Sequence, residues 1–343
     1  MTLVVTHPNR RRPRKGEDLW RLLLAAALVF LLSAGGLTAD TWHPLQNTPV
    51  ATNSGAAIVL GRPDSLYAMF GGNSTAFRCY RPPTTNSWST FTPAQLPFQS
   101  GAGGALVADT FASCIYALRG GGTSEFWKYN IPLNSWLRLA DIPAPVTAGG
   151  ALASERRDNA LFVYAIVGGQ SSSVYRYGIH YGPQPQGIIQ WYQVASLHTS
   201  GGVALQAGPG ACLAATNDSI FCIPCDPDVY NATIAYSPVA NDWYPSAYFS
   251  GVTPSPGCAM AGWYWVANGA RRLRCLVGDE SVHGGPDNHV RERWFGVGDY
   301  WRNYTSTGTN HQRMGASITW DPVGWSYAFF GNNSTAFKRS AYY

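Results

Sequence analysis

The densest group of potentially reactive side chains lies in residues 278–293, GDESVHGGPDNHVRER, which contain Asp279, Glu280, His283, Asp287 and His289. Imidazole and carboxylate groups are common metal ligands, so His283, Asp287 and His289 could bind a metal ion. Their spacing, however, matches no tight metal-binding motif. A solvated polar loop is therefore the favoured interpretation, and neither a metal nor a cofactor is predicted.

Seven cysteines are present, two of which form the sequence Cys-Ile-Pro-Cys at Cys222 and Cys225. This spacing occurs in redox motifs, but the surrounding pattern is a strand followed by a turn, without the helix N-terminus that lowers a thiol pKa. A structural disulfide is favoured, linking Cys222 or Cys225 to Cys212, and Cys258 and Cys275 could pair similarly. Because the count is odd, at least one cysteine stays free or pairs with another chain.

Aspartates recur at turn positions along the chain, at Asp64, Asp109, Asp158, Asp218 and Asp321. Two carboxylates at a suitable separation could perform acid–base chemistry. Their recurrence favours a role in the turns instead, because aspartate side chains accept hydrogen bonds from nearby backbone amides. The sequence also lacks a glycine-rich phosphate loop, a serine nucleophile elbow and a zinc-protease motif, so no catalytic residue is predicted.

The N-terminal 39 residues have the order of a secretory signal. A basic stretch, RRRPRK, precedes an unbroken apolar run of 11 residues and then small residues. The run is shorter than the roughly 20 residues that span a bilayer, so a cleaved signal peptide is favoured over an uncleaved signal-anchor. Both alternatives export residues 40–343 to an extracellular, periplasmic or lumenal compartment. Membrane contact is then expected only through the N-terminal helix, if it is retained.

The charge distribution argues against a nucleic-acid partner. Residues 1–39 hold six cations and two anions, whereas the rest of the chain holds 18 cations and 17 anions. A nucleic-acid-binding domain needs a basic face, and the exported part has no such excess. Export makes N-glycosylation possible, although the same residues also suit turns; the candidate sequons begin at Asn73, Asn217, Asn231, Asn303, Asn332 and Asn333.

An internal repeat organises the exported part. YAMFGGNSTAFRCY (67–80) aligns without gaps with YALRGGGTSEFWKY (116–129) and YAIVGGQSSSVYRY (164–177). Weaker copies occupy residues 220–236 and 273–285, and YAFFGNNSTAF (327–337) is the last. A run of small apolar residues precedes each copy, and a tryptophan follows the first five. The repeat residues are the diglycines Gly71-Gly72, Gly120-Gly121 and Gly168-Gly169 and the tryptophans Trp88, Trp136, Trp191, Trp243 and Trp301.

Each repeat is interpreted as four short strands, and long amphipathic helical patterns are absent after residue 40. Successive tryptophans are 48 to 58 residues apart, close to the kelch period of about 50 residues. The exported part therefore resembles the kelch-repeat β-propellers, a superfamily that includes the central domain of galactose oxidases. The predicted fold class is all-β, with blades at residues 55–97, 101–143, 148–198, 201–247, 255–305, and 311–343 completed by 40–49.

The last repeat has no tryptophan strand of its own. The segment DTWHPLQNTP (40–49) resembles the fourth strands of other repeats and contains Trp42. If it completes the sixth blade, the ring closes by pairing the first strand with the last and loses an exposed edge. A seventh blade in residues 200–210 is the alternative, but GGVALQAGPG is interpreted as a loop between blades. Six blades are predicted.

Two features bear on function. The turns GNST, GGTS, GQSSS and GNNST are rich in hydrogen-bonding side chains that suit sugar or peptide recognition, and equally suit plain turns. The kelch resemblance also implies possible enzymes, namely copper oxidases or sugar mutarotases, but no copper-binding or acid–base residues can be carried over. The prediction is a non-catalytic exported scaffold for a protein or carbohydrate ligand on a propeller face. The alternatives are a carbohydrate-active enzyme and a self-associating subunit of an extracellular assembly.

Overall fold

A computed structural model divides the chain into two compact units, residues 1–39 and 40–343. The predicted signal or anchor segment lies outside the described residues. Within the part described, regular structure consists of strands, and no helix there is long and apolar enough to cross a membrane. The structure describes residues 42–82, 86–89, 93–157, 159–180, 190–216, 218–229, 233–246, 256–265, 270–278, 289–295, 301–306 and 313–340.

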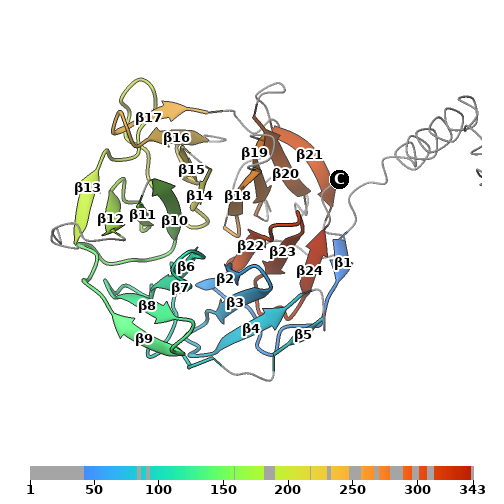
Figure 1. The fold of residues 1–343 in the computed structure, drawn as a ribbon. Helices are drawn as coiled ribbons and strands as arrows, with labels where there is room; N and C mark the ends of the chain where they lie inside the picture. The colour runs from blue at the N-terminus through green and yellow to red at the C-terminus, as the bar shows by residue number, and fades with distance from the viewer. Residues whose placement is uncertain are drawn as a thin grey trace, which may run out of the picture. The chain divides into compact units, whose positions relative to one another are not determined.

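The strands form six antiparallel sheets of four strands each, which are the blades of a propeller (Figure 1). Blades 1 to 3 are β2 (Ala56–Arg62), β3 (Ser65–Phe70), β4 (Phe77–Arg81) and β5 (Ser87–Trp88); β6 (Ala105–Asp109), β7 (Cys114–Leu118), β8 (Phe126–Asn130) and β9 (Ser135–Arg138); and β10 (Gly150–Arg157), β11 (Ala160–Val167), β12 (Val174–His180) and β13 (Trp191–Val194).

Blades 4 to 6 follow the same order. They are β14 (Cys212–Ala215), β15 (Ile220–Ile223), β16 (Ile234–Ser237) and β17 (Asp242–Pro245); β18 (Ala259–Trp265), β19 (Ala270–Leu276), β20 (His289–Trp294) and β21 (Trp301–Ser306); and β22 (Ala316–Trp320), β23 (Ser326–Phe330) and β24 (Phe337–Ser340), completed by β1 (Trp42–Pro44). The prediction of an all-β, six-bladed propeller is confirmed.

The ring is closed through its innermost strands. The first strand of each blade contacts the first strand of the next, in the order β2, β6, β10, β14, β18, β22 and back to β2. Small residues in these strands allow six sheets to meet around one axis, while larger side chains fill the gaps between blades. The core is accordingly divided into clusters between neighbouring blades, as where Tyr116 and Phe126 of blade 2 pack with Tyr177 and Trp191 of blade 3.

The N-terminal strand completes blade 6. Trp42 pairs with Ser340 and Pro44 with Lys338, and the amide of Leu45 then donates to the carbonyl of Phe337 at 2.9 Å. The closure that the sequence predicted is therefore present. Residues 200–210 form no strand of a seventh blade: they belong to the connection between β13 and β14 and make only isolated bridges, such as Ser171 with Ala207.

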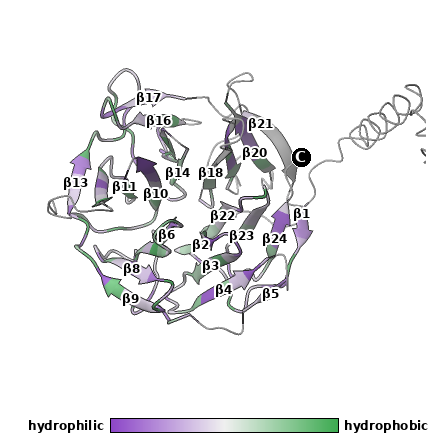
Figure 2. Cartoon of the chain, viewed as in Figure 1, coloured by the Kyte–Doolittle hydropathy of each residue, from purple (hydrophilic) through white to green (hydrophobic). Residues whose placement is uncertain are grey.

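The outermost strands bury little beyond their tryptophan. In β1 and β13 only Trp42 and Trp191 are buried, and Trp243 is the buried residue of β17. Figure 2 shows β1 and β13 as mainly hydrophilic strands at the edge of the ring. A single apolar side chain thus fixes which face of each short edge strand is turned inward, because side chains alternate between the two faces.

A repeated hydrogen-bonded clamp joins the outer strands to the connection from the preceding blade. In blade 4 the Oδ1 atom of Asn241 accepts hydrogen bonds from the hydroxyl of Tyr236 at 2.8 Å and from the amide of Ala195 at 3.1 Å. The Nε1 atom of Trp243 donates back to the carbonyl of Ala195 at 2.8 Å. Burial raises the pKa of Tyr236, so its hydroxyl remains a donor at neutral pH.

The same clamp occurs in two other blades. In blade 2 Asn134 accepts from Tyr129 and from the amide of Ala94, and in blade 1 Asn86 accepts from Tyr80. The three asparagines Asn86, Asn134 and Asn241 adopt φ values of 45°, 49° and 52°. Asparagine tolerates this left-handed conformation better than most residues, which explains its place two residues before the repeat tryptophan.

The Asn241→Gly substitution is expected to lower the free energy of unfolding by about 1–3 kcal/mol. Glycine keeps the left-handed backbone but removes the acceptor, which leaves the Tyr236 hydroxyl and the Ala195 amide without this partner. Urea unfolding followed by tryptophan fluorescence measures the change. Asn332→Gly is the matched control, because Asn332 is also left-handed but exposed, and its cost should stay within about 0.5 kcal/mol. Equal losses of unfolding free energy in the two variants would show that the hydrogen bonds accepted by Asn241 do not stabilise the blade.

Candidate functional site

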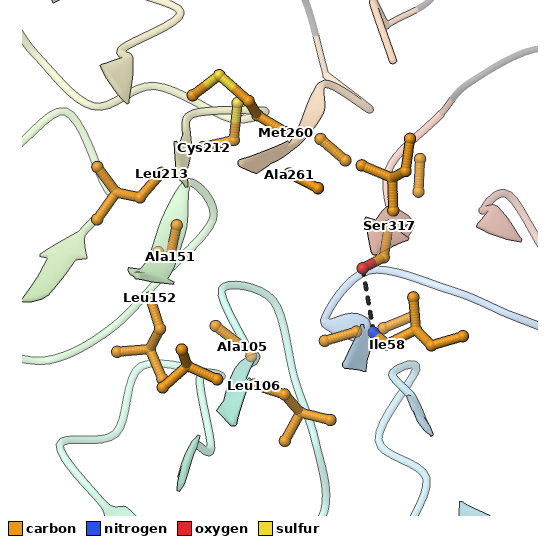
Figure 3. Close-up of a pocket in the computed structure, with 18 of the residues that line it drawn as sticks. Ile58, Ala105, Leu106, Ala151, Leu152, Cys212, Leu213, Met260, Ala261 and Ser317 are labelled. Atoms are coloured by element: carbon orange, nitrogen blue, oxygen red, sulfur yellow. Dashed lines mark hydrogen bonds between the residues drawn. The ribbon is translucent and has the colours of Figure 1, made fainter. Parts of the chain in front are cut away.

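The six innermost strands surround a channel of about 380 Å³ along the ring axis. Figure 3 shows side chains from different blades around it, including Leu106 of β6, Leu152 of β10 and Ser317 of β22. The Ser317 hydroxyl accepts a hydrogen bond of 3.1 Å from the amide of Ile58 and so bridges blades 6 and 1 across the ring junction.

The channel wall carries no carboxylate, imidazole or cationic side chain among the described residues. Its lining consists of glycine, alanine, valine, leucine, isoleucine, proline, methionine, serine, threonine and the cysteines Cys212 and Cys258. General acid–base catalysis requires a titratable side chain within hydrogen-bond reach of the reacting atom. The described wall offers hydroxyls and apolar contact but no such carboxylate, imidazole or cationic group.

The turns between the second and third strands lie at the same end of the blades as the connections between blades. Gly71 and Gly72 have φ values of 67° and 62°, and the diglycines Gly120-Gly121 and Gly168-Gly169 adopt nearly the same conformation. A Cβ atom on Gly71 would collide with the backbone of Asn53 and Ser54. The first glycine of the pair therefore allows this turn to pack directly against the connection into its blade.

A polar pocket of about 700 Å³ opens on this face. Its lining comes from the turns and connections of blades 1, 5 and 6: Asn53, Ser54, Gly72, Pro256, Arg313, Met314 and Asn332. Ser54 and Met314 also line the axial channel, so the pocket adjoins the channel mouth. It combines one guanidinium group with two side-chain amides and a hydroxyl, all of which can bind oxygen-rich ligands. We call these seven residues the mouth pocket.

The recurrent aspartates that the structure describes serve turns. The Oδ1 atom of Asp321 accepts from the amides of Val323 and Trp325 at 3.0 and 2.9 Å, and its Oδ2 atom accepts from the Tyr327 hydroxyl at 2.9 Å. Asp109 accepts from a turn amide in the same way. Asp218 accepts from the Ser219 hydroxyl in its turn but also pairs with Arg271 of blade 5 at 2.6 Å, whereas Asp158 lies outside the described residues.

The structure places the seven cysteines on different sides of the blades. The structure joins none of the seven by a disulfide. Cys222 packs toward blade 3, whereas Cys212, Cys258 and Cys275 belong to one cluster between blades 4 and 5, with Cys225 packed against it. The two cysteines of Cys-Ile-Pro-Cys therefore face opposite sides of blade 4. The disulfide pairs expected from the sequence remain predictions.

The other candidate positions are partly outside the described residues. His283, Asp287, Asn217 and Asn231 fall there, and the side chains of His289 and Asn303 are not described either. In the described ranges, no group of three or more histidine, cysteine or acidic side chains is arranged to hold a metal ion. Asn73, Asn332 and Asn333 are exposed at turn tips, where glycosylation remains a prediction.

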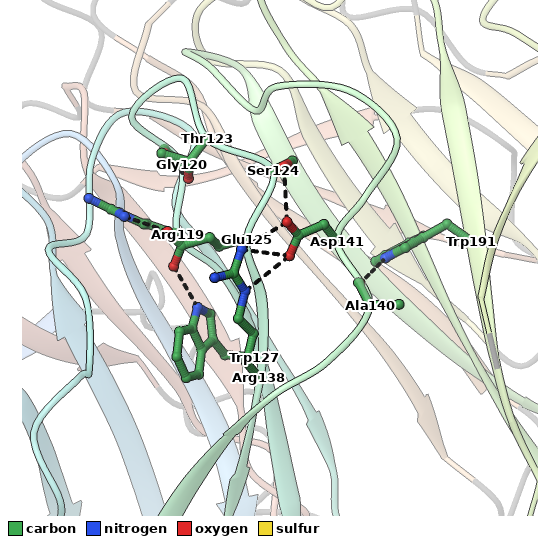
Figure 4. A network of polar contacts seen from close by, with 10 residues as sticks. All are labelled: Arg119, Gly120, Thr123, Ser124, Glu125, Trp127, Arg138, Ala140, Asp141 and Trp191. Atoms are coloured by element: carbon green, nitrogen blue, oxygen red, sulfur yellow. Dashed lines mark hydrogen bonds and ion pairs between the residues drawn. The ribbon is translucent and has the colours of Figure 1, made fainter.

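A polar network beside the blade 2 turn shows how charged groups are used near this face (Figure 4). Arg119 forms an ion pair with Glu125 at 2.5 Å, and Glu125 also accepts from the indole nitrogen of Trp127 at 3.0 Å. Arg138 pairs with Asp141 at 2.8 Å. These contacts tie turn, strand and connection together within blade 2, so they are structural contacts.

A fully buried ion pair lies between blades 5 and 6, and sequence reasoning did not identify it. Arg274 of β19 contacts Glu292 of β20 at 3.2 Å, and both side chains are wholly excluded from solvent. Arg274 also donates to the Ser326 hydroxyl of blade 6 at 2.6 Å and lies over the Trp320 ring. Its only sequence signal is a run of charges in a strand pattern, RRLRC, where apolar residues would be expected.

Comparison with known proteins identifies the fold. No protein-family model and no curated protein sequence matches the chain. The structure of YjhT is similar with a TM-score of 0.58 and 12% identity, covering 86% of this chain and 95% of that one. A structural genomics protein of unknown function from Bacteroides thetaiotaomicron VPI-5482 gives a TM-score of 0.56 and 11% identity, covering 88% and 72%. These likenesses support the six-bladed propeller fold.

Proposed function

We propose that this chain is an exported kelch-type propeller that acts as a non-catalytic scaffold and binds a carbohydrate in the mouth pocket. The observation that carries the proposal is the pairing of a polar pocket with an axial channel whose described wall has no carboxylate, imidazole or cationic side chain. The propeller provides a rigid frame, and the ligand contacts come from turns and connections at one end of the blades.

The channel lining argues against the enzyme alternative. Opening, closing or oxidising a sugar ring requires groups that move protons or electrons at the bound ring. The residues that line the described channel are small, apolar or hydroxylic, apart from the two cysteines Cys212 and Cys258. Such a wall can enclose part of a ligand, but it supplies no carboxylate, imidazole or cationic group for proton transfer.

The composition of the mouth pocket supports an oxygen-rich ligand. The amides of Asn53 and Asn332 can each donate to and accept from hydroxyl groups, and the Ser54 hydroxyl can do both. The guanidinium of Arg313 can bind a carboxylate through two parallel hydrogen bonds. A sugar that carries a carboxylate, such as a hexuronate unit, matches both kinds of group.

The Arg313→Ala substitution is expected to weaken binding of a hexuronate-containing oligosaccharide by about 10- to 100-fold, because a charged hydrogen bond contributes about 1.5–3 kcal/mol. A glycan array of neutral and hexuronate-containing oligosaccharides, probed with the full chain, selects the strongest binder, and calorimetry then measures its Kd. Arg138→Ala is the matched control, since it removes the same charge from β9, away from the pocket.

Two results would count against the proposal. The carbohydrate assignment fails if no oligosaccharide on the array binds, or if Arg138→Ala weakens binding as much as Arg313→Ala. The non-catalytic assignment fails if the protein accelerates anomer exchange or oxidation of the selected sugar, followed by NMR. Export is tested separately by mass spectrometry of the N-terminus of the protein recovered outside the cytoplasm.

A further inference from the structure

The facing sides of blades 4 and 5 share a cluster of thiols. Cys212 lies in β14 and Cys225 lies two residues after β15, both in blade 4. In blade 5, Cys258 directly precedes β18 and Cys275 lies in β19. Cys212, Cys258 and Cys275 are buried in one core cluster, and Cys225 packs against it. Four of the seven cysteines thus meet at a single junction of the ring.

Strand alternation separates these four thiols from Cys222. Phe221 and Ile223 point toward blade 5 with the cluster, while Cys222 between them packs against blade 3. In blade 5, Met260 is opposite Cys275, and both residues turn toward blade 4. The spacing in the sequence suggests that Cys222 and Cys225 act together, but Cys222 of β15 packs on the blade 3 side, while Cys225, in the turn after β15, packs on the blade 5 side.

The contacts among the four thiols form a chain. Within the cluster, Cys258 is near enough to Cys225 to raise the pKa of the Cys225 thiol, and Cys258 and Cys212 are both near enough to Cys275 to add to the rise that burial gives its pKa. Among these contacts, one set of pairs uses all four thiols: Cys225 with Cys258 and Cys212 with Cys275. Joining Cys258 to Cys275 instead would stay within blade 5 and leave Cys225 and Cys212 without a contacting thiol to pair with.

We propose that Cys225–Cys258 and Cys212–Cys275 form two disulfides that join blade 4 to blade 5. In each, two thiols lose two protons and two electrons as the S–S bond forms, and the electrons reduce the disulfide of an exchange partner, such as oxidised glutathione or a dithiol oxidoreductase, to two thiols. Each bond links a cysteine of blade 4 to a cysteine of blade 5.

The environment explains when the bonds form and what they do. Burial, together with the neighbouring thiols, raises the pKa of Cys275, which disfavours the thiolate in the closed ring. Oxidation is therefore expected during folding, as blades 4 and 5 come together and while the thiols are still accessible to the exchange partner. The turn of blade 4 at this junction also lacks the diglycine found in blades 1 to 3, because Pro224-Cys225 occupies that position. Two covalent links would secure the junction that has the weakest repeats.

Peptide mapping without reduction tests the pairing directly. The full chain is refolded in a glutathione redox buffer, remaining thiols are blocked with iodoacetamide, and linked peptides are identified by mass spectrometry. The expected links join Cys225 to Cys258 and Cys212 to Cys275, with Cys79, Cys114 and Cys222 alkylated. Reductant should lower the Tm of the oxidised protein by about 5–10 °C.

Cysteine variants show whether these links cause the Tm shift. Cys258→Ser should remove the Cys225–Cys258 peptide and reduce the reductant-dependent shift, while Cys79→Ser in blade 1 should keep both links and the full shift. Seven alkylated cysteines after oxidative refolding would overturn the proposal. A Cys258–Cys275 link, or one stoichiometric metal ion bound by the four thiols in elemental analysis, would overturn it as well.

Discussion

Deletion of residues 41–49 from the full chain is expected to lower the Tm by about 10 °C or more. The deletion removes β1, so β24 loses its partner and becomes an open edge of blade 6. It also removes Trp42, which packs at the junction of blades 5 and 6 against Leu276 and Phe330. Loss of a buried tryptophan alone costs about 3–5 kcal/mol, and the lost strand pairing adds to that cost.

Differential scanning calorimetry of the full-length variants measures this effect. The matched control deletes residues 2–10 and leaves β1 in place, so its Tm should stay within about 2 °C of the parent chain. The point substitution Trp42→Ala separates packing from chain length and should lower the free energy of unfolding by about 3–5 kcal/mol. An unchanged Tm after removal of residues 41–49 would show that ring closure does not depend on the N-terminal strand.

Replacement of Glu292 by leucine is expected to lower the free energy of unfolding by about 3–5 kcal/mol. The substitution removes the carboxylate that contacts the Arg274 guanidinium in a site that excludes solvent, where loss of a charge partner is costly. Arg274 keeps the Ser326 hydroxyl and the face of Trp320, at 4.5 Å from its ring centre, but neither carries a compensating charge. The damage should therefore be concentrated at the junction of blades 5 and 6.

A double-mutant cycle distinguishes the effect of removing the charge partner of Arg274 from the effect of altered packing. Arg274→Met combined with Glu292→Leu removes both charges, and this double variant should recover most of the stability lost by Glu292→Leu alone. The exposed Arg138–Asp141 pair provides the comparison, since Asp141→Ala should cost less than about 1 kcal/mol. If the double variant is as unstable as the sum of the two single variants, the two charges do not act as a pair.

Sequence periodicity predicted most of the fold because a propeller repeats local patterns. The diglycine, tyrosine and tryptophan positions recur in each strong repeat, so strand order could be inferred even where blades 4 and 5 diverge. The unpaired ending of the last repeat and the tryptophan strand at residues 40–49 predicted the ring closure that β1 and β24 show. Each of these inferences needed only the order of residues along one blade.

The candidate site required contacts between blades that no local pattern contains. Arg313 and Asn53 are 260 residues apart, yet both line the mouth pocket because the ring brings blade 6 beside blade 1. The asparagine of each Asn-x-Trp segment could be assigned to a turn, but its bond to the preceding connection, as from Asn241 to Ala195, appears only in three dimensions.

The amino-acid sequence by itself determined the fold class, the number of blades and the strand that closes the ring, because these follow from alternation and repetition within each sheet. Only the tertiary structure decided which side chains meet between sheets. It placed Cys222 and Cys225 on opposite faces of blade 4, paired Arg274 with Glu292 in the core, and left the described channel wall without carboxylate, imidazole or cationic side chains. Those outcomes depend on register and blade packing, in which a shift of one residue turns a side chain to the other face.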